Sequence, residues 1–182
     1  MILYHSLLCP SALFGCSVLA AIADVRERRI PNKLVSSVFV CGIMLHLGFG
    51  GAAQAACSAL AALIGGGAFM IFYLAGGMGA GDVKLIAALS AVAGISNVKD
   101  LLIATVLAGA ACALVFAIWR GALRSTLANV IVLLMHHGKH GFTAHPRLNV
   151  SNTSTHRLPY AVPTAVACGW LLSMQCVARA VR

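Results

Sequence analysis

Long apolar runs separated by short polar or glycine-rich stretches dominate this chain. Most of these runs approach the roughly 20 residues that a helix needs to cross the hydrocarbon core of a bilayer. The pattern therefore predicts an all-α fold, a polytopic integral membrane helical bundle of about six transmembrane spans. The runs cover residues 2–23, 34–49, 53–75, 83–95, 101–119 and 159–178.

The first run has one competing interpretation, because Ala21-Ile22-Ala23 follows the A-x-A pattern of a signal-peptide cleavage site. However, no basic residue precedes the run, and its length and Pro10 fit a retained span better. We expect the first run to stay in the protein as a span.

The polar segment 120–157 separates the fifth run from the sixth. At its start, apolar residues recur at helical spacing, which is typical of a helix lying in the membrane interface. These residues are Leu123, Leu127, Val130, Ile131 and Leu134. With 182 residues in all, we expect a single membrane-embedded domain, 1–182, with a cytoplasmic loop and interfacial helix at about 120–157.

The basic residues predict the orientation of the spans, because cytoplasmic loops carry an excess of Lys and Arg. With the charged stretch 24–33 in the cytoplasm, loops 76–84 and 120–157 fall on the same side, and both termini lie outside. That side then holds ten basic residues: Arg26, Arg28, Arg29, Lys33, Lys84, Arg120, Arg124, Lys139, Arg147 and Arg157. The far side holds three: Lys99, Arg179 and Arg182.

The composition supports a membrane protein over a soluble one. The chain is 60% hydrophobic and 9% charged, with a mean hydropathy of +0.94, whereas soluble domains carry about 25% charged residues. The formal net charge of +9 would suggest nucleic acid as the partner of a soluble protein. Here the basic loops account for it, so we expect membrane lipids and no nucleic acid.

Cysteine and histidine patterns give no metal or redox signature. The seven cysteines lie in or beside apolar runs without a CxxC pair, so we expect small buried hydrophobic residues. His136, His137 and His140 have a spacing that could bind a metal, but no carboxylate or cysteine lies nearby. We therefore expect neither a metal nor an organic cofactor.

Asp24 and Asp82 are carboxylates at span boundaries. Asp24 ends the first run and Asp82 opens the fourth, so the predicted topology puts both at one membrane face. Each has a structural interpretation: Asp82 as a helix N-terminal charge, Asp24 as the partner of a following arginine. Ionisable residues at membrane depth are nevertheless a functional hypothesis. Two carboxylates brought together share a proton, as aspartyl proteolysis requires.

A small proton-coupled transporter or channel is the alternative, because membrane acids and glycine-broken helices mark those sites too. It would place the acids near the middle of the bilayer, whereas Asp24 and Asp82 lie beside basic residues at one face. Lys84 can tune the charge of Asp82 or can extend to the lipid headgroups. The glycines before Asp82 would let an extended peptide pair closely with the backbone, or form only a flexible turn.

Three motifs together resemble the type IV prepilin peptidases, the GxGD aspartic peptidases. Gly79-Ala80-Gly81-Asp82, followed by Val83-Lys84-Leu85, resembles their GxGD element. Asp24, with Arg26 and Ile30-Pro31-Asn32, resembles their first aspartate motif, and Leu158-Pro159-Tyr160 resembles a late Pro-aromatic element. Ala161 stands where the family often has glycine.

The resemblance implies an aspartic endopeptidase that removes the short basic leader from pilin-like precursors at the cytoplasmic face of the bacterial inner membrane. Asp24 and Asp82 would be catalytic. Residues that would bind substrate or support the site are Gly79, Gly81, Lys84, Pro31, Asn32, Pro159 and Tyr160.

Long members of that family carry a cytoplasmic insert with paired cysteines and also methylate the new N-terminus. This chain has no CxxC and no room for the insert, so it is similar to the short members that serve Flp or tight-adherence pili, and we expect no methyl transfer. The motifs leave open which pilin is cut, which aspartate is the acid, and the oligomeric state.

Overall fold

The structure, a computed structural model, describes residues 2–27, 30–141, 143 and 160–180, with the backbone alone at 2–7, 137, 139–140 and 179–180. Every regular element among these residues is a helix, which confirms the predicted all-α bundle. The helices are α1 (Ile2–Glu27), α2 (Asn32–Leu74), α3 (Ala80–Ala93), α4 (Val98–Trp119), α5 (Leu123–His140) and α6 (Ala161–Ala180). Four of them, α1, α2, α4 and α6, are long and apolar enough to cross a membrane.

Helix α2 contains both the second and the third predicted spans. Its backbone breaks at Gly51, where φ is 71° and ψ is −169°, a conformation that glycine adopts far more readily than other residues. The two halves both contact Ala91 of α3, the first through Gly42 and the second through a hydrogen bond from Ser58 to the Ala91 carbonyl at 2.7 Å. The apolar stretch 32–74 is therefore a hairpin that holds α3 between its arms.

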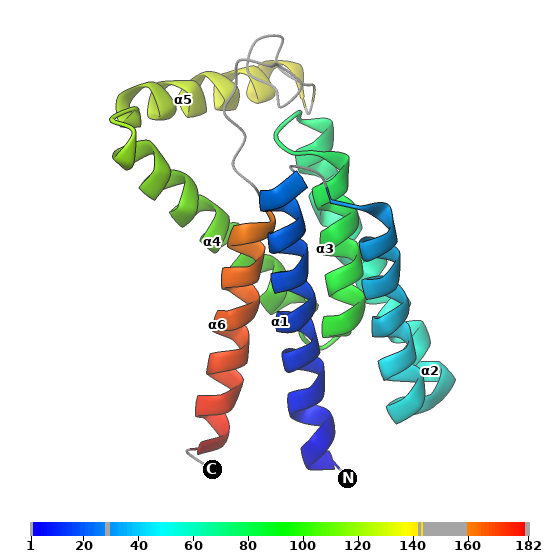
Figure 1. The fold of residues 1–182 in the computed structure, drawn as a ribbon. Helices are drawn as coiled ribbons and strands as arrows, with labels where there is room; N and C mark the ends of the chain where they lie inside the picture. The colour runs from blue at the N-terminus through cyan, green and yellow to red at the C-terminus, as the bar shows by residue number, and fades with distance from the viewer. Residues whose placement is uncertain (1, 28–29, 142, 144–159, 181–182) are drawn as a thin grey trace.

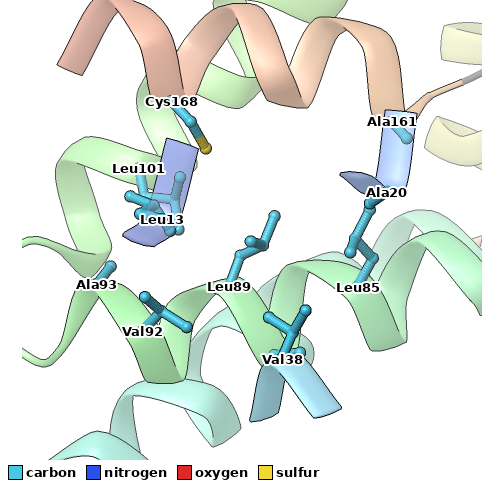
Figure 2. Packing of buried hydrophobic residues seen from close by; sticks show 11 residues of the cluster. Leu13, Ala20, Val38, Leu85, Leu89, Val92, Ala93, Leu101, Ala161 and Cys168 are labelled. Atoms are coloured by element: carbon cyan, nitrogen blue, oxygen red, sulfur yellow. The ribbon is translucent and has the colours of Figure 1, made fainter. Parts of the chain in front are cut away.

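Helix α3 occupies the centre of the bundle. Its 14 residues span about 21 Å at 1.5 Å per residue, less than the roughly 30 Å of a bilayer core. Its buried residues run from Val83 to Ala93 and are all apolar except Ser90, as expected of a helix surrounded by protein. Figure 2 shows its side chains meeting those of α1, α2, α4 and α6 in one core: Leu13, Ala20, Val38, Leu85, Leu89, Val92, Leu101, Ala161 and Cys168.

The two chain ends lie at one end of the bundle, and the opposite end gathers the polar connections. Figure 1 shows α1 ending, and α2, α3 and α6 beginning, at this opposite end, with α5 lying across it. Asp24 and Asp82 stand on the elements that meet there.

Helix α5 covers the segment predicted to form a helix outside the spans. Leu127, Val130, Ile131 and Leu134 are all exposed, and the helix lies roughly across the direction of the spans (Figure 1). Residues 144–157 of the predicted loop lie outside the described part of the chain.

The prediction that the cysteines are buried is correct for Cys9 and Cys168 and wrong for Cys41 and Cys176, which are exposed. Helices that cross a bilayer are apolar on the side that faces lipid as well as on the side that faces protein. An apolar run therefore does not distinguish the two sides.

Candidate active site

Helix α1 positions Asp24 on its buried face. Leu13, Ser17, Ala20 and Asp24 recur at intervals of three and four residues, so they share one side of the helix, and all four are buried. Asp24 is 8% exposed, and its Oδ2 accepts a hydrogen bond from the backbone N–H of Ala161 at 3.3 Å. Because Ala161 begins α6, Asp24 satisfies an N–H that the helix itself leaves unpaired, at the positive end of the α6 dipole.

Asp82 lies in the first turn of α3, on the segment that follows the second arm of α2. The N–H of Gly79 donates to Asp82 Oδ2 at 3.2 Å, and the N–H of Asp82 donates to the Gly79 carbonyl at 3.1 Å. These reciprocal bonds hold the carboxyl at the helix N-terminus, where a negative charge is favoured. Asp82 is thus a helix N-terminal charge, one of the interpretations that its position in the sequence allowed. The same hydrogen bonds also fix the direction of its carboxyl group.

The surroundings of Asp82 favour its protonated form. The pKa of Asp82 is raised from 3.8 to about 6: burial is the main cause, the hydrogen bond from Gly79 lowers the pKa, and the negative charge of Asp24 adds to the increase. The electrostatic interaction between the two carboxyls means that the bundle brings together residues 58 positions apart in the chain. Two neighbouring carboxyls repel each other when both are ionised, so one of them tends to keep its proton.

Tyr160 joins this pair from the turn before α6. Its ring packs edge-on against Phe69 of α2 with the centroids 6.2 Å apart, and its hydroxyl lies close to Gly109 of α4. Burial and the negative charge of Asp82 raise the pKa of Tyr160 to about 12. The phenol therefore stays neutral and can donate a hydrogen bond beside the two carboxyls. Pro159 lies outside the described residues.

The residues after Asp24 lie against the residues around Asp82. Gly81 lies beside Ile30, where an added Cβ would be 3.8 Å from the Ile30 Cβ. Lys84 Nζ donates to Asn32 Oδ1 at 3.4 Å, so the contact that the structure gives this lysine joins α3 to α2. Pro31 caps α2, and its carbonyl accepts the N–H groups of Leu34 and Val35 at 3.0 and 3.2 Å.

Sequence reasoning missed three contributors to the site: the Ala161 N–H, the Phe69 ring and the close approach of Gly109. A backbone donor leaves no residue-type signal, and Phe69 and Gly109 belong to apolar runs in which any face can turn inward. Among the described residues no three His, Cys, Asp or Glu side chains cluster so as to hold a metal ion. The side chains of His137 and His140 are not among those described.

Comparison with known proteins identifies the family. The family model described as the type IV leader peptidase family matches residues 11–118, a region that contains Asp24, Asp82 and the glycines before Asp82. No curated protein and no solved structure matched the chain. A match over more than half of the chain, combined with the apolar helices, confirms the predicted resemblance and a membrane-embedded peptidase. The chain belongs to the type IV leader peptidase family.

Proposed function

We propose that this protein is an aspartic endopeptidase that removes the short basic leader from pilin-like precursors at the cytoplasmic face of the bacterial inner membrane. Asp24 and Asp82 form its catalytic pair. The observation that supports the proposal is that these two carboxyls stand at the same end of the bundle, near enough for the negative charge of Asp24 to raise the pKa of Asp82. A single acid at a helix end would have no such partner.

The pair supplies the two proton transfers of amide hydrolysis when one carboxyl is ionised and the other protonated. The ionised carboxylate takes a proton from water as the water oxygen attacks the scissile carbonyl carbon, and the protonated carboxyl gives its proton to the carbonyl oxygen. As the tetrahedral intermediate collapses, the C–N bond breaks, the leaving nitrogen takes the proton of the protonated carboxyl, and one hydroxyl of the intermediate returns its proton to the ionised carboxylate. No metal or organic cofactor enters these steps.

The neighbouring residues have supporting roles in this proposal. The Gly79–Gly81 backbone lies next to Asp82 and presents little side-chain bulk, so an extended substrate strand can approach it and pair with it. Tyr160, neutral beside the carboxyls, can donate a hydrogen bond to the substrate. The contact of Lys84 with Asn32, together with Pro31, fixes the start of α2 against α3 and so holds the two motifs in register.

Leader removal in cells tests the catalytic pair. A pilin precursor is co-expressed with the wild type, with Asp24→Asn or with Asp82→Asn, and the precursor and mature forms are separated on a gel. We expect both asparagine variants to accumulate uncut precursor. Asp100→Asn is the matched control, since Asp100 is an exposed carboxylate in the first turn of α4, and it should cleave as the wild type does. Full cleavage by Asp24→Asn or Asp82→Asn would contradict the pair.

Thiol labelling tests the orientation. In a background without the native cysteines, Lys84→Cys places an exposed thiol near the start of the central helix α3, and Lys99→Cys places one beyond its end, at the start of α4. A membrane-impermeant reagent applied from outside should label Lys99→Cys and leave Lys84→Cys unmodified until the membrane is permeabilised. The reverse pattern would place the site at the outer face.

A further inference from the structure

An apolar groove runs along the outside of the bundle between α1 and α6. Its volume is about 530 Å³, within the usual range of ligand-binding sites. Four residues of α1 and two of α6 form its walls: Phe14, Val18, Ile22, Val25, Val162 and Val166. Both helices are candidate membrane spans, and they lie side by side at the front of Figure 1. The groove therefore faces the bilayer.

Helical spacing connects the groove to the candidate active site. The α1 wall recurs every three or four residues, and so does the buried stripe that ends in Asp24, so the two stripes are adjacent on α1. Val25 directly follows Asp24 in the chain. On α6, Val162 directly follows Ala161, the residue whose N–H binds the Asp24 carboxylate. The groove thus begins beside Asp24, and Arg26 lines this end.

We propose that this groove binds the apolar, membrane-inserted helix of the peptide substrate and so delivers the bond that follows the leader to Asp24 and Asp82. The inference rests on the proposed function and adds to it the site that holds the substrate. A chain that leaves the catalytic pair toward the bilayer must be helical, because lipid offers no partner to an open backbone. A helix in lipid packs best where small residues allow close approach, and Ala21 and Ala165 line the groove.

The dimensions fit one face of such a helix. From Phe14 to Val25 the α1 wall covers about 17 Å at 1.5 Å per residue, which corresponds to about three turns of a bound helix. Lipid acyl chains would also fit an apolar groove, but nothing in acyl chemistry requires the groove to start at the catalytic carboxyl. Continuity with Asp24 is what favours a peptide.

Filling the groove tests the proposal, and α6 offers a matched control. Val166 lines the groove and is 55% exposed, whereas Val177 lies on the same helix outside the groove and is 60% exposed. Cleavage by Val166→Trp and Val177→Trp is measured on two substrates: a complete precursor in vesicles, and a short peptide containing only the leader and the cleavage site.

We expect Val166→Trp to lower kcat/KM for the complete precursor about tenfold, since an indole in the groove removes contacts worth about one apolar side chain. The short peptide should be cleaved at the wild-type rate, and Val177→Trp should match the wild type on both substrates. Equal losses on the two substrates, or no loss on either, would overturn the proposal.

Photo-crosslinking separates this proposal from the peptidase function. A photoreactive residue at position 166, in the Asp24→Asn background that retains uncut precursor, should crosslink to the apolar segment of the precursor, and the same residue at position 177 should not. Crosslinking to lipid alone would overturn the groove assignment even when the wild type cleaves. If position 166 crosslinks to the precursor but the wild-type protein does not cleave that precursor, the result would support the groove and contradict the peptidase function.

Discussion

Asp82 makes the folded protein less stable at neutral pH than a neutral residue would at the same place. Its pKa is raised from 3.8 to about 6, mainly by burial, so the folded state holds the proton more tightly than the unfolded state does. The contribution of Asp82 to the free energy of unfolding is therefore most favourable below pH 3.8 and falls as the pH rises to about 6. Above that range the penalty is complete and constant.

The size of the penalty follows from the shift. A pKa difference of about two units, at about 1.36 kcal/mol per unit, corresponds to about 3 kcal/mol. Asp82→Asn removes the charge, and its amide oxygen can still accept the N–H of Gly79. We expect this variant to be more stable than the wild type by up to about 3 kcal/mol at pH 8 and by little at pH 4.

Thermal unfolding in detergent at pH 4 and pH 8 measures this difference. For globular chains of about this length, 1 kcal/mol shifts the Tm by about 2–4 °C, so Asp82→Asn should gain about 6–12 °C at pH 8. Asp100→Asn, which removes an exposed carboxylate, is the control and should follow the wild-type pH dependence. A variant that gains nothing at pH 8, or gains equally at both pH values, would refute the burial of an ionised Asp82.

Two further predictions concern packing and the Asp24 hydrogen bond. Gly42→Ala places a Cβ 2.7 Å from the backbone nitrogen of Val92, so this variant should lower the free energy of unfolding by about 1–3 kcal/mol. In the control Gly48→Ala the new Cβ meets open space, and the free energy of unfolding should change little. Equal Tm values for the two variants would contradict this packing. Ala161→Pro removes the N–H that binds Asp24, and the first position of a helix accepts proline. This variant should slow cleavage about tenfold. Unchanged cleavage would show that this hydrogen bond does not support the reaction.

The apolar runs predicted the helices well because a membrane imposes both their length and their composition. All six predicted runs are helical in the described residues apart from one or two positions at their ends, and a short turn containing Ser96 and Asn97 separates α3 from α4. The run 83–95 was harder to interpret, because apolar residues all round are equally consistent with a lipid-facing span and with a helix enclosed by protein. Helix α3 is the enclosed kind, with Leu85 and Leu89 almost fully buried.

The candidate site was predictable only in part. Asp24 and Asp82 stood out because this apolar chain has only four carboxylates and the count of basic residues put these two at one face. Their interaction depends on α3 entering the bundle between the arms of α2, which no local pattern reveals. The Ala161 N–H and the groove beside it depend on which face of α6 meets α1, and this is decided by tertiary packing.

The central claim is that Asp24 and Asp82 act as one catalytic unit, and a double-mutant cycle tests it most directly. Single-turnover cleavage of a precursor is measured for the wild type, Asp24→Asn, Asp82→Asn and the double variant. Residues that act as a unit are strongly non-additive, so we expect each single variant to lose at least about a thousandfold in rate and the double variant to lose no more. Losses that multiply in the double variant, or a single variant that keeps the wild-type rate, would contradict the account.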